Sequence, residues 1–172
     1  KGLLKTAIRD PNPVIFLENE ILYNEPLAST NIEEGLIPFG KAKILKQGSD
    51  ITIVSYGIGI KHALQAITIA EKEGISIELI DLRSLRPLDY ESVFTSVKKT
   101  NRCITIEECF PVCSIGNHLS ASIMENVFDY LDAPVINLSG KDVPMPYAKN
   151  LEKEALVTVD EILSAIKKVT NG

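Results

Sequence analysis

The chain has 172 residues, of which 45% are hydrophobic, so it is long enough and apolar enough to bury one core. Its 18 basic and 23 acidic residues give a net charge of −5, and its lysines are scattered, which argues against a nucleic-acid-binding surface. No apolar stretch is long enough to span a membrane and no signal-peptide pattern is visible, so we expect a soluble protein in a reducing compartment.

The first part of the chain reads as the end of one domain followed by a linker. Apolar residues recur at helical spacing over the first eight positions, and Pro11 and Pro13 end that pattern. Val14–Leu17 then predicts a short buried strand, whereas residues 19–38 have no apolar periodicity. We therefore predict that residues 1–35 end a preceding domain, that residues 36–172 form a second domain, and that the chain is a fragment.

Strands and helices alternate regularly in the second domain. This alternation predicts right-handed β-α-β crossovers and a three-layer α/β sandwich with a mostly parallel, five-stranded sheet. The short first strand, which a tight turn joins to the second, is predicted to be an antiparallel edge. The predicted strands are Lys41–Leu45, Ile51–Ser55, Ile75–Leu82, Cys103–Glu107 and Pro134–Leu138, and the helices run from about Ala63 to a Gly74 cap, from an Asp89 N-cap to Lys99, over Gly116–Tyr130 and over Asp160–Val169.

A glycine-containing turn follows the second strand. Gly57 and Gly59 lie where a strand passes into a helix, which is where a backbone can approach a phosphate. A dinucleotide fingerprint requires a third glycine, but His62 occupies that position, and only Glu78 and Asp81 are acidic in the next strand. A tight structural turn is the favoured interpretation, with an anion site and a nucleotide site as alternatives.

Charged residues follow the next two strands. Arg83 and Arg86 come after one strand, and Glu107 and Glu108 end the following one. Such a cluster at the carboxyl edge of a sheet is either a catalytic site or, as we favour, an ion-paired structural network. No nucleophile elbow, phosphate-binding loop or histidine pair is present, so the sequence shows no self-contained active site.

Three cysteines are present, and two of them are closely spaced. Cys109 and Cys113 form a C-x-x-x-C pattern, which is neither the C-x-x-C redox motif nor a zinc-knuckle spacing. We interpret them as structural thiols, with a reactive or metal-binding role as the alternative.

The stretch Asp142–Lys149, with the sequence DVPMPYAK, is too rich in proline for a helix or strand. Pro144 and Pro146 fix two φ angles and remove two backbone donors, which favours a pre-ordered extended loop. Such a loop is expected to dock either on the domain's own sheet or on a partner.

Six motifs together resemble one enzyme family. They are Lys-Gly-Leu-x-Lys-x-Ala-Ile-Arg-Asp from position 1, Val-x-x-Leu-Glu-Asn-Glu at 14–20, Pro-x-Gly-Lys-Ala-Lys at 38–43, Arg-Pro-x-Asp at 86–89, Leu-Asp-Ala-Pro at 131–134 and DVPMPYAK at 142–149. In this order they resemble the beta subunits of acetyl-transferring pyruvate dehydrogenases, which depend on thiamine diphosphate. The resemblance covers the whole chain and implies a transketolase-like C-terminal domain preceded by the tail of a pyrimidine-binding domain.

The resemblance also implies function and partners. Two alpha and two beta subunits of this family form a heterotetramer that decarboxylates pyruvate and acetylates lipoyl groups. The residues that hold thiamine diphosphate and magnesium precede the part matched here, so this part alone is expected to be inactive. Its expected partners are the alpha subunit, a second beta subunit and the basic subunit-binding domain of dihydrolipoyl acetyltransferase, in a bacterial cytoplasm or the mitochondrial matrix.

A structural potassium site is implied in the same way. The family's potassium-binding loop maps onto Ala7, Ile8, Asp10 and Asn12, whose oxygen atoms suit a hard cation. The sequence departs from the family at Pro11, and again over residues 108–114, where the family carries a glycine-rich segment with an aromatic residue.

Two alternative functions remain open at this point. One is a beta subunit for branched-chain 2-oxo acids or acetoin, from which only DVPMPYAK separates this chain. The other is a free-standing flavodoxin-like binding module, which the incomplete glycine pattern disfavours.

Overall fold

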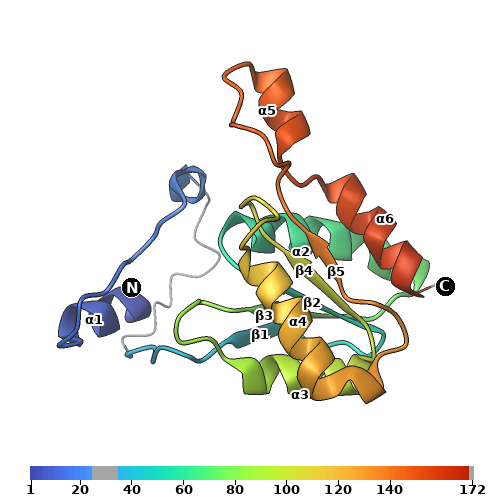
Figure 1. Ribbon diagram of the computed structural model, residues 1–172, viewed down its shortest axis with the longest axis horizontal. Coiled ribbons are helices and arrows are strands. Elements are labelled where there is room, and N and C mark those ends of the chain that lie inside the picture. Colours follow the sequence, from blue (N-terminus) through green and yellow to red (C-terminus); the bar gives the residue numbers. More distant parts are fainter. Residues whose placement is uncertain (25–34, 171–172) are drawn as a thin grey trace.

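The fold is built on one five-stranded sheet with the strand order β1-β3-β2-β4-β5. The computed structural model describes residues 1–24 and 35–170. Four strands are parallel, and only β1 runs antiparallel to its neighbour (Figure 1). The predicted α/β fold with an antiparallel edge strand is confirmed. The strands are β1 (Lys43–Lys46), β2 (Ile51–Ser55), β3 (Ile77–Asp81), β4 (Cys103–Ile106) and β5 (Ile136–Leu138).

Helices cover both faces of the sheet and make two separate cores. The helix α2 (Ile58–Ala70) packs beside α6 (Val159–Thr170) on the face that carries Ile53 and Leu79. The helices α3 (Tyr90–Thr100) and α4 (Ile115–Val127) cover the opposite face. Because β2 is buried on both faces, every one of its five residues is enclosed, which explains its β-branched sequence.

Local capping signals set the helix ends. The side chain of Asp89 accepts a hydrogen bond from Ser92 N at 3.2 Å and so caps α3, as predicted. The short helix η2 (Glu71–Glu73) extends α2, and Gly74 ends it with φ 85, the predicted left-handed cap. The helix α4 begins at the Ser114 cap and continues into η3 (Phe128–Tyr130).

Two elements differ from the sequence prediction. The first strand, β1, pairs with β3 and not with β2, so the turn between β1 and β2 crosses to another position in the sheet and forms no hairpin. Residues that follow DVPMPYAK form a helix, α5 (Lys149–Ala155), which the prediction omitted. Its seven residues are too few for a clear helical period, and the neighbouring prolines favour a loop.

The N-terminal part lies apart from the sheet (Figure 1). It contains α1 (Gly2–Arg9) and η1 (Glu20–Asn24), and Thr6 Oγ1 donates to Ile37 O at 2.7 Å. The prediction of a buried strand at Val14–Leu17 is wrong, because Ile15 is 88% exposed and Leu17 is 83% exposed. The five strands described form a single sheet, and this segment does not join it.

The predicted boundary near residue 35 stays a prediction, and most of the predicted linker lies outside the described residues. Among residues 1–24 and 35–170, no helix is both long and apolar enough to cross a membrane.

Candidate functional site

The carboxyl ends of β2, β3, β4 and β5 meet at one edge of the sheet. From β2 the chain adds β3 on one side of the sheet and then β4 and β5 on the other side, so the strand order reverses between β2 and β4. Ligands of open α/β sheets bind outside such a switch point. The segments at this position are the Tyr56–Gly57 turn and the loop from Glu107 to Ser114.

The carboxylate of Glu107 is the centre of this edge. The residue is 2% exposed, and both carboxylate oxygens accept a hydrogen bond from Gly116 N at 3.1 Å. Asn137 Nδ2 donates at 3.0 Å, Tyr56 OH at 3.3 Å and Cys109 Sγ at 3.1 Å. Because Gly116 lies in the first turn of α4, the helix dipole also stabilises the negative charge. Each carboxylate oxygen is therefore occupied by protein donors, an arrangement that suits a structural role better than proton transfer to a ligand.

Asn137 connects Glu107 to β5, the outermost strand on this side of the sheet. Its side-chain oxygen accepts from Thr105 Oγ1 at 2.8 Å, while its amide nitrogen lies 3.1 Å from Asn117 Oδ1. The end of β4, the strand β5 and the start of α4 are thus held by one polar network. The sequence prediction missed Asn137, since an isolated asparagine in a short strand gives no signal of its partners.

The glycine turn brings the start of α2 close to the sheet. Gly57 adopts φ 57 at the N-cap of α2. A Cβ atom on Gly59 would lie 2.3 Å from Ser55 Oγ, which itself donates to Ile106 O at 2.9 Å. Gly59 therefore lets α2 approach the sheet, in agreement with the structural interpretation. The third position of the fingerprint, His62, is half-buried, and burial together with Lys61 lowers its pKa.

An apolar groove begins at this turn and follows α2. It has a volume of about 440 Å³ and is lined by Leu22, Gly57, Ile60, Lys61, Leu64, Gln65 and Thr68. Its lining has few polar groups that would converge on a nucleotide.

The predicted cluster of arginines and glutamates does not form. Arg83 follows β3 and Glu107 follows β4, and β2 lies between these two strands. Within the residues that the structure describes, neither Arg83 nor Arg86 forms an ion pair with Glu107 or Glu108. The sequence placed both groups at the correct edge but carried no information about strand order.

Glu108 connects this edge to the N-terminal part instead. Asn19 Nδ2 donates to Glu108 Oε2 at 2.9 Å. Burial raises the pKa of Glu108, and the hydrogen bond from Asn19 opposes this shift. Glu108, which follows β4, thus contacts the residue that immediately precedes η1.

The cysteines are free thiols. Burial and the neighbouring Glu107 raise the pKa of Cys109 to about 11, and burial raises the pKa of Cys103 to about 12. Neutral thiols are poor nucleophiles and metal ligands, which favours the structural interpretation. Over residues 1–24 and 35–170, no three His, Cys, Asp or Glu side chains lie together as metal ligands.

The four residues of the predicted potassium site lie at the end of α1. Ala7 and Ile8 belong to its last turn, and Asp10 is the C-cap. Asp10 Oδ1 accepts hydrogen bonds from Asn12 N and Asn12 Nδ2, both at 2.9 Å, and these bonds lower the pKa of Asp10. Helix-end carbonyls and the Asp10 carboxylate are therefore adjacent in the chain.

The DVPMPYAK loop and α5 form an arm that projects from the sheet (Figure 1). Lys141 N donates to Ala155 O at 2.9 Å and closes the base of the arm. Tyr147 is fully exposed, and Val143, Met145 and Leu151 are also exposed. The alternative in which this loop docks on the domain's own sheet is therefore wrong for these side chains, because they are exposed.

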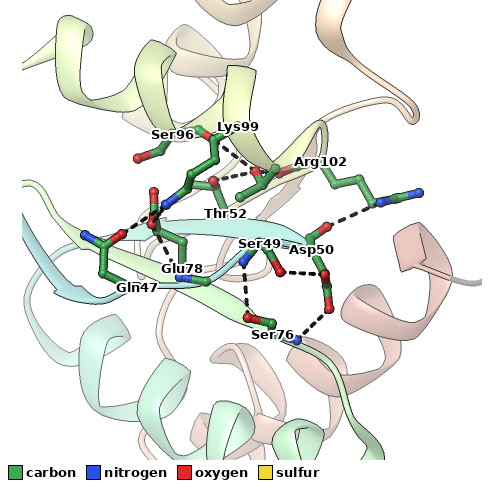
Figure 2. Close-up of polar contacts among 11 residues, drawn as sticks. Gln47, Ser49, Asp50, Thr52, Ser76, Glu78, Ser96, Lys99 and Arg102 are labelled. Atoms are coloured by element: carbon green, nitrogen blue, oxygen red, sulfur yellow. Dashed lines mark hydrogen bonds and ion pairs between the residues drawn. The ribbon is translucent and has the colours of Figure 1, made fainter.

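A second polar network lies at the opposite, amino edge of the sheet (Figure 2). The carboxylate of Glu78 is buried in β3, pairs with Lys99 Nζ and accepts from Gly48 N at 3.4 Å. Asp50 Oδ2 accepts from Ser76 N at 2.7 Å, and Arg102 pairs with Asp132 at 3.2 Å. Glu78 therefore lies at the opposite end of the sheet from the glycine turn and does not contribute to a ligand site there.

Comparison with known proteins gave one family and many relatives. Residues 40–162 match the model described as "Transketolase, C-terminal domain". The chain is 53% identical over 169 residues to the pyruvate dehydrogenase E1 component subunit beta of Rhizobium meliloti (strain 1021), covering 98% of this chain and 37% of that protein. It is 53% identical over 171 residues to the mitochondrial subunit beta-2 of Oryza sativa subsp. japonica, covering 98% of this chain and 46% of that protein. The predicted resemblance is confirmed, and the chain spans about half or less of the length of these relatives.

Solved structures gave the same fold. A split-gene transketolase, an inactive beta4 tetramer, superposes with a TM-score of 0.71 at 27% identity, covering 86% of this chain and 46% of that one. A 2-oxoglutarate:ferredoxin oxidoreductase from Magnetococcus marinus has a TM-score of 0.51 at 15% identity, covering 76% of this chain and 19% of that one, and supports the fold alone.

Proposed function

Because the chain belongs to the transketolase C-terminal domain family, we propose that it is the C-terminal part of the beta subunit of a thiamine-diphosphate-dependent pyruvate dehydrogenase. The observation that carries this proposal is about 50% identity over almost the whole chain to beta subunits of that enzyme. The complete enzyme would decarboxylate pyruvate oxidatively and transfer the acetyl group to lipoyl groups. It would work in a bacterial cytoplasm or the mitochondrial matrix.

This part of the subunit serves assembly in the proposal. The exposed arm at residues 141–155 supports this role, because an ordered apolar projection loses little conformational entropy on docking. The tetrameric state of the split-gene transketolase supports self-association of the family. The proposed partners are the alpha subunit, a second beta subunit and the basic subunit-binding domain of dihydrolipoyl acetyltransferase, whose charge complements a chain of net charge −5.

The proposed chemistry belongs to other parts of the enzyme. The relatives extend well beyond the part that this chain matches, and we assign thiamine diphosphate and magnesium to residues outside this chain. The donors around Glu107 already bind its carboxylate. Potassium is proposed to bind at Ala7, Ile8, Asp10 and Asn12 through backbone oxygens and the Asp10 carboxylate.

A chimera tests the proposal directly. This chain would replace the matching C-terminal part of a beta subunit that is 53% identical to it, and the chimera would be purified with the alpha subunit. We expect a heterotetramer that reduces lipoyl groups with pyruvate in the presence of thiamine diphosphate and magnesium. The chain alone is expected to be inactive under the same conditions.

The same experiment separates the alternatives. Faster turnover of branched-chain 2-oxo acids or acetoin than of pyruvate would contradict the proposed substrate. A folded chimera that does not bind the alpha subunit would contradict the proposed assembly role. Tight binding of a flavin or nucleotide by the chain alone would instead favour a flavodoxin-like binding module.

A further inference from the structure

Four basic side chains gather at the corner of the sheet where β1 meets β3. They are Lys41, Lys43, Arg83 and Arg86, and we call them the basic corner. In the β1–β3 register Lys43 lies opposite Asp81, two residues before Arg83. Gly40 N donates to Ser84 Oγ at 2.8 Å, and Ser84 Oγ donates to Pro87 O at 2.9 Å. Residues 40–43 and 83–87 are therefore interlocked, and their charges lie on one part of the surface.

The charges of the basic corner are not neutralised by ion pairs. Lys41, Lys43 and Arg86 are exposed and Arg83 is partly exposed. Within residues 1–24 and 35–170 none of the four forms an ion pair, whereas five other basic residues do: Lys46, Lys99, Arg102, Lys141 and Lys167.

The two nearby acidic residues already have other partners. Asp81 accepts from Arg83 N at 3.1 Å, and burial raises its pKa while Arg83 and Lys43 act against that shift. Asp89 accepts from Ala42 N at 2.9 Å and from Ser92 Oγ at 2.8 Å. Both carboxylates therefore hold the backbone of the corner in place. They attract Lys43, Arg83 and Lys41 electrostatically, but in the part of the chain that the structure describes neither forms an ion pair with them, so the cationic ends can still bind a partner.

The backbone of Arg83 is held in an unusual conformation. Its φ is 58, a left-handed value that is uncommon for a residue with a Cβ atom. The hydrogen bond from Arg83 N to Asp81 fixes this turn. Residues kept in such conformations concentrate at binding sites, where they direct a side chain.

We propose that the basic corner is a docking surface for a carboxylate-rich segment of a partner protein. Guanidinium groups bind carboxylates through two parallel hydrogen bonds, and here two arginines lie three residues apart. Since the chain as a whole has a net charge of −5, an acidic partner is repelled elsewhere and is oriented toward this corner. This inference does not depend on which reaction the complete enzyme catalyses.

Carboxylates fit this surface better than phosphates. Phosphate sites use backbone N–H groups that point at the ligand. At the basic corner the N–H groups of Gly40, Ala42, Arg83 and Ser84 already donate to protein oxygens. These four N–H groups are therefore not available to a phosphate, and the side-chain donors of the corner match an extended acidic segment.

The test measures binding of a fluorescent polyglutamate peptide by anisotropy. The variant Arg83→Asn/Arg86→Gln removes two charges, and asparagine tolerates the left-handed φ. The matched control Lys149→Gln/Lys153→Gln removes two exposed charges from α5. We expect the arginine variant to raise the dissociation constant of the peptide by at least about tenfold, and the control to raise it by less than about twofold. Binding to the unchanged chain should weaken as the salt concentration rises.

Several results would overturn the proposal. These are no binding to the unchanged chain, equal loss in the control, or displacement of the peptide by inorganic phosphate at an equal or lower concentration. If the arginine variant fails to fold, Lys41→Gln/Lys43→Gln replaces it, because both lysines are exposed and the substitution leaves the Arg83 turn intact. Unchanged binding in that second variant would also overturn the proposal.

Discussion

Glu78 and Lys99 form an ion pair in which only the lysine reaches solvent: the side chain of Glu78 is 1% exposed and that of Lys99 is 43% exposed. Glu78 lies in β3 beside Thr52 of β2, and Lys99 reaches it from the last turn of α3 (Figure 2). The Thr52 hydroxyl is hydrogen-bonded to that of Thr100. One of the carboxylate oxygens of Glu78, Oε1, has no hydrogen-bond partner among residues 1–24 and 35–170. A buried carboxylate with so few donors depends strongly on its single cation.

The first prediction removes that cation. The variant Lys99→Met leaves the Glu78 charge buried and unpaired, so we expect the free energy of unfolding to fall by about 1–3 kcal/mol in urea denaturation. The control Lys167→Met breaks the exposed pair with Glu73 and should cost less than about 1 kcal/mol. Equal losses in the two variants would contradict a special role for the buried pair.

The second prediction concerns Gly116 at the start of α4. A Cβ atom there would lie 2.1 Å from Asn137 Oδ1 and 2.5 Å from Glu107 Oε1. The variant Gly116→Ala should therefore lower the free energy of unfolding by about 1–3 kcal/mol, because the buried network has no room to move. Gly35→Ala is the control, since no atom of the described residues lies within 4 Å of its added Cβ. A Gly116→Ala protein as stable as this control would show that Asn137 and Glu107 can move to accommodate the added Cβ at little cost in free energy.

Elements with strong local signals were predictable from the sequence. The β-branched run of Ile51–Ser55 predicted β2, and Asp89 and Gly74 were identified as caps because capping depends on residues a few positions apart. The proline-rich stretch also predicts a loop, and residues 142–148 form neither helix nor strand.

Contacts between distant segments could not be predicted in this way. The separation of Arg83 from Glu107 follows from β2 lying between β3 and β4, and strand order leaves no trace in either motif. The pair of Glu78 with Lys99 joins residues on different elements for the same reason. Val14–Leu17 has the composition of a buried strand but lies exposed, because its burial depends on a partner that composition does not specify.

The third prediction tests the arm. Tyr147 is fully exposed, so Tyr147→Ala should change the free energy of unfolding by less than about 0.5 kcal/mol. If the arm packs against another subunit, the variant should nonetheless raise the dissociation constant of assembly by at least about tenfold, because aromatic side chains dominate the binding energy of interfaces. Light scattering of the chimera with the alpha subunit measures this effect. Tyr130→Ala, at an exposed tyrosine of η3, is the control, and equal assembly of the two variants would remove the arm from the interface.

The fourth prediction concerns the start of α6. Glu161 N donates to Thr158 Oγ1 at 3.2 Å and Thr158 N donates to Glu161 Oε2 at 2.9 Å, which together form a capping box. Burial acts to raise the pKa of Glu161, but hydrogen bonds from Lys141 and Thr158 outweigh it and lower the pKa. A lowered pKa in the folded state means that the stabilisation is complete above the ordinary value of 4.5 and is lost as pH falls through the folded value.

Glu161→Gln should therefore be less stable than the unchanged chain at neutral pH, and the difference should shrink as the pH falls below 4.5. Urea midpoints measured across this range give the comparison. Glu154→Gln, at an exposed glutamate of α5, should show no such convergence. A constant difference between Glu161→Gln and the unchanged chain at all pH values would rule out the lowered pKa as the cause.

The fifth prediction examines the proposed potassium site at the end of α1. An ion that binds only the folded state raises the melting temperature by mass action, so we expect the chimera to melt about 2–4 °C higher in potassium chloride than in lithium chloride of equal ionic strength. Asp10→Ala removes the only charged ligand and should abolish this difference, whereas Asp129→Ala on η3 should preserve it. Hydrogen bonds from Asn12 lower the pKa of Asp10, so its charge and the potassium effect should persist under mildly acidic conditions. Equal melting temperatures in the two salts would remove potassium from the proposal and leave Asp10 as a helix cap that Asn12 stabilises.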